Sequence, residues 1–271
     1  MRLGRSSAAG ALDGSRWGMP ERWVVRLAGR GAEQVELAHL HAALSHWFDH
    51  RPAEGAAPGT DTHTAVEKDY SVSAPTLMTL GGLSVTVGTL TGSAAVALLR
   101  HATPGQLVRL GSASLRITEP PELESHRTWA ELASDTGARA WTLDFQSPTS
   151  FLRGQRTSPL PTPEVVLRGL MVDWRTWADA TSYTPPEHTP SGVIVTEIDG
   201  TTERLQVGHR WYRGFVGRVR FSADETSAPL VAPLFALAPF TGVGAGTRKG
   251  LGTVRLVETS RPAAARMSTA T

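Results

Sequence analysis

Histidines are the side chains of this sequence best suited to acid–base chemistry near neutral pH. The chain has 271 residues, nine histidines and no cysteine. An imidazole titrates close to neutrality and can therefore act as a general base or a general acid. His63 is the first candidate, because it lies between a segment rich in glycine and proline and a strand-like segment. Such a side chain can reach a cleft and still be held in place; the alternative is an exposed loop histidine.

Four further histidines lie in residues 33–50, a segment with the spacing of an amphipathic helix. Its apolar stripe consists of Leu37, Leu40, Leu44 and Trp47. His39, His46 and His50 share a narrow arc opposite this stripe, which indicates a solvated helix face. A zinc site on these three is disfavoured, because no supporting carboxylate pattern accompanies them. His41 borders the apolar stripe and faces another way.

A second chemical candidate is the glycine-rich segment FTGVGAGTRKGLGTVRL, residues 240–256. A phosphate-binding P-loop needs Ser or Thr after its lysine, but Lys249 is followed by Gly250. The dinucleotide pattern fails too, since its third glycine, Gly246, comes one residue early. Helical spacing precedes the segment and a strand-like alternation follows it, which reverses the order of both motifs. A nucleotide site is therefore disfavoured.

Composition limits the remaining function classes. Without cysteine there is no disulfide, thiolate zinc site or cysteine nucleophile. No apolar run is long enough to span a membrane and no secretory signal is visible, so we expect a cytoplasmic protein without a membrane partner. Only two of the 27 basic residues are lysines, and the sequence pI is about 9.4. Base-composition bias explains most of the arginine excess, which is also compatible with nucleic acid.

The hydrophobic patterns predict an α+β fold in which one arrangement occurs twice. In the first half we expect strands at 22–30, 68–74, 82–90 and 107–118 and helices at 33–50 and 93–101. In the second half we expect strands at 139–146, 191–199, 214–222 and after the glycine-rich loop, a helix starting at Pro163 with Thr162 as its cap, and a short or irregular helix at 230–237. Both halves read β-α-β-β-α-β, which predicts two tandem ferredoxin-like (RRM-like) domains.

Four segments follow from this organisation. Residues 1–20 are expected to be a flexible N-terminus, and residues 21–130 the first ferredoxin-like domain. Residues 137–258 are expected to form the second domain with its C-terminal glycine-rich loop, and residues 259–271 a disordered tail.

Two such units with a glycine-rich loop before the last strand resemble the RAMP proteins of CRISPR systems. Three motifs resemble the second domain of the CRISPR repeat-processing endoribonucleases, the sixth CRISPR-associated protein family: LDFQSPTSFLRG…SPLPTPEVVLRGL (143–170), GFVGRVRF (214–221) and the glycine-rich segment itself. In the first half, HTAVEKDYSVSA (63–74) resembles the segment that carries this family's catalytic histidine. The resemblance covers most of residues 22–257.

The resemblance implies metal-independent cleavage of precursor CRISPR RNA within its repeats. The RNA's 2′-hydroxyl attacks the adjacent phosphate and leaves 2′,3′-cyclic phosphate and 5′-hydroxyl ends. No metal or other cofactor is implied. The expected partners are CRISPR repeat RNA, other subunits of a CRISPR effector complex and a second copy of the chain. The alternative is a non-cleaving RNA-binding RAMP subunit with the same fold and loop.

The resemblance also assigns roles to residues. His63 takes the catalytic position, and Lys68 is an electrostatic partner for the phosphate. Some family members carry a second catalytic side chain, often tyrosine, on the first helix. This chain has no tyrosine there, and His41 or Ser45 would substitute. The expected RNA-binding residues are Ser147, Thr149, Arg153, Arg156, Arg213, Arg218, Gly242, Gly244, Gly246, Arg248, Lys249, Gly250 and Gly252. Phe215 and Trp211 are expected to be core residues, with base stacking as the alternative.

Overall fold

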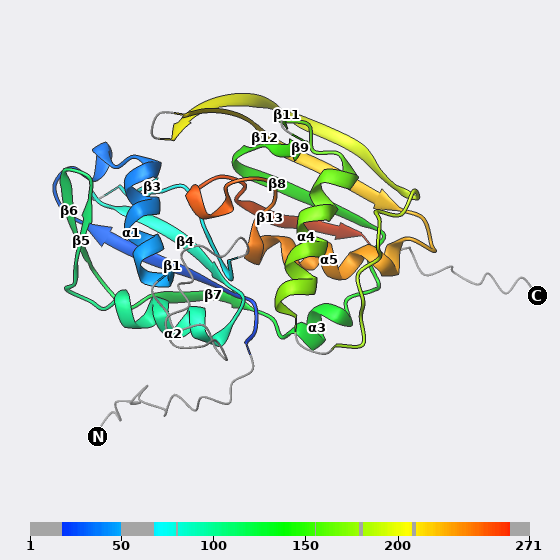
Figure 1. Cartoon of the computed structure of the whole chain (residues 1–271), viewed down its shortest axis with the longest axis horizontal. Coiled ribbons are helices and arrows are strands. Elements are labelled where there is room, and N and C mark those ends of the chain that lie inside the picture. Colours follow the sequence, from blue (N-terminus) through cyan, green and yellow to red (C-terminus); the bar gives the residue numbers. More distant parts are fainter. Residues whose placement is uncertain are drawn as a thin grey trace, which may run out of the picture.

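The computed structural model of the chain describes residues 18–49, 68–79, 81–154, 156–178, 181–207 and 210–260. The predictions for His50, for His63, for residues 1–17 and for residues 261–271 lie outside the described residues. Figure 1 shows the described part as two sheets with helices packed on them, arranged side by side.

The first sheet is antiparallel and has the order β2-β4-β1-β6-β5. Its strands are β1 (Glu21–Ala28), β2 (Tyr70–Val72), β4 (Leu83–Thr89), β5 (Leu107–Leu110) and β6 (Ala113–Ile117), with β3 (Thr76–Leu77) added beside β4 and β7 (Glu122–His126) beside β1. The helices of this half are η1 (Ala32–Gln34), α1 (Leu37–Asp49) and α2 (Gly92–His101). The four central strands have the spatial order second, third, first and fourth, which is the ferredoxin-like order.

The second sheet repeats this order as β11-β12-β8-β13. Its strands are β8 (Ala140–Thr149), β11 (Val193–Val207), β12 (Arg210–Ala223) and β13 (Val254–Ser260), and its helices are α4 (Pro163–Trp177) and α5 (Ala228–Thr241). Three smaller elements are α3 (Trp129–Ala133), the hairpin of β9 (Phe151–Arg153) with β10 (Arg156–Ser158), and η3 (Thr247–Lys249), which lies inside the glycine-rich loop. The α+β fold of two tandem ferredoxin-like units is confirmed.

Several elements differ from the sequence expectation. The strand expected at 107–118 is a hairpin that turns at Gly111, where φ is 67°. The hairpin of β11 and β12 is longer than predicted and extends across the top of the molecule in Figure 1. Thr162 starts α4 without capping it, and its Oγ1 instead accepts a hydrogen bond from Arg153. β13 runs to Ser260, two residues past the predicted boundary.

Helix α5 was expected to be short or irregular because of its prolines, and that expectation is wrong. The helix has 14 residues and continues through Pro233 and Pro239. Eleven of its 14 residues are buried, most of them in the core of the second unit. Packing on several sides therefore outweighs the hydrogen bonds that the prolines remove.

Two separate hydrophobic clusters form the cores of the described chain. The first packs α1 and α2 against the first sheet and includes Leu40, Leu44 and Trp47 of the predicted stripe, whereas Leu37 is buried outside this cluster. The second packs α4 and α5 against the second sheet and also takes in Trp129 and Leu132 of α3. Among the described residues, no helix has the length and apolar character needed to cross a membrane. The exact domain boundaries stay a prediction.

The two units meet at the C-terminal end of α5. Arg22 of β1 is only 7% exposed, and its Nη1 donates to the carbonyls of Pro239 (3.0 Å) and Val254 (3.2 Å). Its Nε donates to Glu124 of β7 at 2.5 Å. Ser71 Oγ of β2 donates to the carbonyl of Phe240 at 2.8 Å. The last carbonyls of a helix have no partner within the helix, so these donors from the other unit satisfy two of them.

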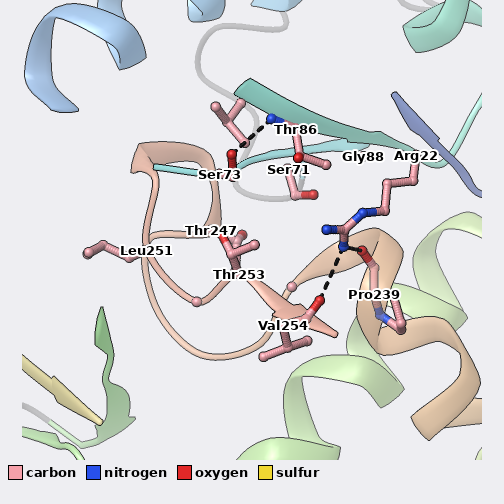
Figure 2. Close-up of a pocket in the computed structure, with 13 residues that line it drawn as sticks. Arg22, Ser71, Ser73, Thr86, Gly88, Pro239, Thr247, Leu251, Thr253 and Val254 are labelled. Atoms are coloured by element: carbon pink, nitrogen blue, oxygen red, sulfur yellow. Dashed lines mark hydrogen bonds between the residues drawn. The ribbon is translucent and has the colours of Figure 1, made fainter. Parts of the chain in front are cut away.

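The contact surrounds a small cavity, drawn in Figure 2, with a volume of about 10 Å³. Such a volume is about enough for one water molecule. The close fit is also visible at Gly88, where a Cβ atom would lie 1.9 Å from the carbonyl oxygen of Phe240. The two units are therefore joined by a dense polar contact.

We predict that Arg22→Met destabilises the protein, because it leaves carbonyls of α5 and β13 without their donor. The expected loss is roughly 1–3 kcal/mol of unfolding free energy, measured by urea denaturation. The matched control is Arg26→Met on the same strand, whose exposed ion pairs with Glu119 and Glu122 should contribute about 1 kcal/mol or less. Equal losses in the two variants would contradict this role of Arg22.

Candidate functional site

The glycine-rich loop lies against the other unit of the chain. Its turn η3 packs on α1 and β2, and Gly250 pairs with Ser73 in a short parallel bridge. Gly250 has φ 81°, and a Cβ atom there would come within 2.7 Å of Leu37 Cδ2 on α1. This position therefore needs glycine for both its backbone conformation and its close approach.

Much of the loop's backbone is hydrogen-bonded inside the protein. Five of its N–H groups donate to backbone carbonyl oxygens of the protein. The pairs are Gly242 to Ala238, Val243 to Gly252, Ala245 to Ser150, and both Lys249 and Leu251 to Gly246. These five N–H groups already have acceptors inside the protein, and the RNA-binding role expected for the loop glycines stays a prediction. The glycines at 242, 244, 246 and 252 also pack closely on protein atoms, so they shape the loop.

Among the described histidines, His41 of α1 makes a hydrogen-bond contact with this loop. Its Nδ1 lies 3.0 Å from the backbone carbonyl oxygen of Arg248 in η3. Ser45, one helical turn further on, has its Oγ 3.1 Å from the same nitrogen and donates to the backbone carbonyl of His41 at 2.6 Å. The side chain of His41 is half-buried, so the imidazole is held between the helix and the loop.

The surroundings of His41 lower the pKa of its imidazole below the ordinary value of 6.5. Burial is the largest cause, and the positive charges of Lys249 and Arg248 add to it. The hydrogen bond to the Arg248 carbonyl and the charge of Asp49 act in the opposite direction but are outweighed. His41 is therefore neutral near pH 7, which is the form that a general base requires.

The sequence indicates Lys68 as a partner of the RNA phosphate, but in the structure its ammonium is paired with a carboxylate of the protein. Its ammonium makes a 2.9 Å ion pair with Asp49 of α1, and the two side chains are only 9% and 6% exposed. Tyr70 is also buried, and burial is the main cause that raises the pKa of its hydroxyl to about 12. The charge of Lys68 is thus matched by Asp49 beneath the site, and its contact with a phosphate stays a prediction.

The predicted RNA-binding residues of the second unit divide into two groups. Ser147 and Thr149 are 2% and 0% exposed: Ser147 Oγ accepts from the N–H of Thr253, and Thr149 Oγ1 donates to the carbonyl of Ser147. Both hydroxyls are hydrogen-bonded inside the fold, and an RNA contact of these two residues stays a prediction. The predicted arginines are exposed, on β9, β10 and β12: Arg153, Arg156, Arg213 and Arg218.

The two aromatic residues of β12 also separate. Phe215 is 5% exposed and belongs to the core, as expected. Trp211 is 55% exposed, and the guanidinium carbon of Arg204 lies 4.2 Å from its ring centroid. The expectation of a core position for Trp211 is therefore wrong.

The remaining histidines of α1 do not gather into a metal site within the described residues. No group of three or more histidine or acidic side chains there has the arrangement of a metal site. His46 is exposed, with its ring 6.5 Å from that of His101, whereas His39 is half-buried, with its ring packed against Gly111. The predicted solvated face is thus right for His46 and only partly right for His39.

Comparisons with known proteins bear on the whole arrangement. Residues 143–254, somewhat less than half of the chain, match the family described as CRISPR-associated endoribonuclease Cas6. A solved Cas6 (TTHA0078) product complex is 24% identical, with a TM-score of 0.73 over 89% of this chain and all of the other. Residues 143–254 thus match the Cas6 family, and the fold of the described chain is similar to that of solved Cas6 structures. The recognition made from the sequence motifs is thereby confirmed.

Two further solved structures share this fold over a similar length. The product complex of Cas6 (TTHB231), from Thermus thermophilus, is 23% identical, with a TM-score of 0.71 over 89% of this chain and all of the other. A Cas6-related protein from Pyrococcus furiosus is 12% identical, with a TM-score of 0.56 over 88% of this chain and 99% of the other. No curated protein matches the chain. The similarity in fold to Cas6 structures thus extends well beyond residues 143–254.

Sequence reasoning missed two residues that matter here, one beside the candidate site and one at the contact between the units. Asp49 was unmarked because a carboxylate near the end of a helix is usually solvated, and only the fold buries it beside Lys68. Arg22 was treated as an ordinary strand residue, because its partners are 217 and 232 positions away. A basic residue at the start of a buried strand is a weak indication that could have drawn attention to it.

We predict that an NMR titration of the free protein will give His41 a pKa below 6.5. Lys249→Gln should raise this pKa, because it removes a positive charge that disfavours the imidazolium. Lys249→Arg keeps the charge and serves as the matched control. A pKa at or above 6.5 in the wild-type protein, or the same pKa in Lys249→Gln, would contradict the described electrostatics.

Proposed function

We propose that this chain is a CRISPR repeat-processing endoribonuclease that cuts RNA without a metal ion. The observation that carries the proposal is His41, a half-buried imidazole neutral near pH 7 and in contact with a loop that bears Arg248 and Lys249. The family match of residues 143–254 supports the same activity, as does the similarity of the fold to two Cas6 product complexes.

The reaction needs a base, an acid and fixed positive charge. In the proposed mechanism His41 Nε2 takes the proton of an RNA 2′-hydroxyl, and the 2′-oxygen attacks the adjacent phosphorus. The bond from phosphorus to the 5′-oxygen breaks, that oxygen takes a proton from water as it leaves, and the His41 imidazolium then releases its proton to the solvent. The products are a 2′,3′-cyclic phosphate and a 5′-hydroxyl. Arg248 and Lys249 stabilise the negative charge that develops on the phosphate.

RNA affinity is proposed to come from the same loop and from the exposed arginines of the second unit. Guanidinium groups suit bidentate contacts to phosphates, and Lys249 adds a compact point charge. Arg153, Arg156, Arg213 and Arg218 are exposed, and they are proposed to contact the bound strand. Repeat RNA is thus the proposed partner. Association with other CRISPR subunits and with a second copy stays a prediction; one similar structure is a partial Cas6-RT-Cas1–Cas2 complex.

His41 and His63 remain two candidates for the catalytic base. The motif resemblance favours His63, whereas the contact with the cationic loop favours His41. We propose His41 as the base. Lys68 is proposed to act through its ion pair with Asp49, because its positive charge balances the buried carboxylate near His41. A supporting role for His63 at the phosphate stays compatible with this assignment.

We predict that the wild-type protein cleaves its cognate repeat RNA in EDTA and that His41→Ala slows the single-turnover rate by roughly 10²–10⁴-fold. His63→Ala is the comparison variant, and a smaller loss there supports the assignment to His41. Repeat affinity should be kept in His41→Ala. Binding without cleavage by the wild-type protein would favour the non-catalytic RAMP subunit, and cleavage only with added metal would overturn the mechanism.

We predict that Arg248→Gln and Lys249→Gln weaken RNA binding and reduce its salt dependence. Each lost contact to a single-stranded phosphate should lower the slope of log K against log salt by about 0.7. Fluorescence anisotropy at pH 8 measures this while His41 stays deprotonated. Arg26→Gln is the control, because the positive charge of Arg26 is already matched by Glu119 and Glu122. Unchanged slopes in both loop variants would remove the loop from the RNA site.

A further inference from the structure

We infer that the glycine-rich loop positions the catalytic base as well as the RNA: the backbone carbonyl of Arg248 holds His41 in the tautomer that carries its hydrogen on Nδ1. Nε2 is then the unprotonated nitrogen that can accept a proton. The catalytic consequence rests on the proposed function, whereas the tautomer is a property of the free protein.

The hydrogen-bond geometry at Nδ1 assigns the tautomer. A carbonyl oxygen can only accept, so the 3.0 Å contact between Nδ1 and the Arg248 oxygen requires a hydrogen on Nδ1. Ser45 leads to the same assignment, because its single hydroxyl hydrogen goes to the backbone carbonyl of His41 at 2.6 Å. Ser45 therefore cannot donate to Nδ1 at the same time, and its oxygen faces that nitrogen as a second acceptor.

The position of the Arg248 carbonyl is fixed by the turn that contains it. The N–H groups of Lys249 and Leu251 both donate to the carbonyl of Gly246, at 2.7 and 3.3 Å, which closes the turn. Gly250 then attaches it to the first unit through the bridge to Ser73 and the contact with Leu37. Gly250 is therefore a positioning residue for His41, although it touches neither the imidazole nor the reacting atoms.

The charged groups around His41 come from both packed elements. Arg248 and Lys249 belong to η3, and Asp49 belongs to α1, where Lys68 pairs with it. The turn η3 carries both the carbonyl that orients His41 and the cations proposed to hold the phosphate. The same turn therefore positions the base and the substrate relative to each other. Substituting the side chain of Arg248 leaves its carbonyl in place, so binding and orientation can be tested separately.

The test is the ¹⁵N NMR spectrum of the imidazoles in the free, full-length protein, with the His41 signals assigned by their loss in His41→Ala. We expect the Nδ1–H tautomer in the wild-type protein and in Ser45→Ala. Gly250→Ala should shift the population toward Nε2–H, because the added Cβ displaces the turn from Leu37. Gly105→Ala is the matched control: its φ of 84° is similar, and no atom lies within 4 Å of the added Cβ.

An Nε2–H tautomer in the wild-type protein would overturn the inference, even if Gly250→Ala does not fold. A change to that tautomer in Ser45→Ala would also overturn it, because Ser45 would then control Nδ1. So would an unchanged tautomer in a folded Gly250→Ala protein.

A kinetic arm separates this inference from the proposed function. At saturating repeat RNA, Gly250→Ala should lower the single-turnover rate at least 10-fold and alter its pH profile, while Gly105→Ala should match the wild-type protein. Failure of the wild-type protein to cleave would overturn the proposed function and leave the tautomer result standing. Cleavage that depends on His41 but is unchanged in Gly250→Ala would overturn the positioning role alone.

Discussion

The buried guanidinium of Arg22 is the interaction on which the relation between the two units depends. It places donors from the first sheet on the carbonyl of Pro239 in α5 and on that of Val254 in β13. The C-terminal end of a helix carries partial negative charge, so a cation is favourable there. Glu124 provides a matching carboxylate on the other side. A buried charge without such partners would be strongly unfavourable, so the units must dock with these groups in register.

This docking determines where the glycine-rich loop can go. The loop leaves α5 directly after the carbonyls that Arg22 and Ser71 bind, and it enters β13 at Val254, the residue that Arg22 also contacts. Both ends of the loop are thus fixed on the first unit, and its middle turn lies on α1. The histidine from one ferredoxin-like unit and the cations from the other meet because both ends of this loop are anchored.

Much of the fold could be predicted from the sequence, because alternating and helical hydrophobic patterns report local geometry. The repeated β-α-β-β-α-β order and the apolar stripe of α1 are examples. The prolines of α5 were misleading, because local propensity does not include burial on several sides. The burial of the Ser147 and Thr149 hydroxyls could not be predicted either, because composition does not show which polar groups are hydrogen-bonded inside the fold.

The candidate site was harder to predict than the fold, because its decisive contact joins residues 207 positions apart. His41 was recognised as different from the other helix histidines, but nothing local pointed to its partner. Lys68 was recognised by its closeness to His63 in sequence, whereas the structure pairs it with Asp49. The local sequence thus identified side-chain types suited to acid–base chemistry and phosphate binding. Only the tertiary contacts indicate which of these side chains lie together in the candidate site.

The junction at the end of α5 also limits how this protein can be recombined with its relatives. An exchanged second unit would have to present helix-end carbonyls at the spacing that Arg22 and Ser71 require. It would also need a turn of the same length, so that a carbonyl again reaches the ring of His41. Chimeras that cross between the two units should therefore be designed around this junction, and a conserved fold alone would not ensure a working hybrid.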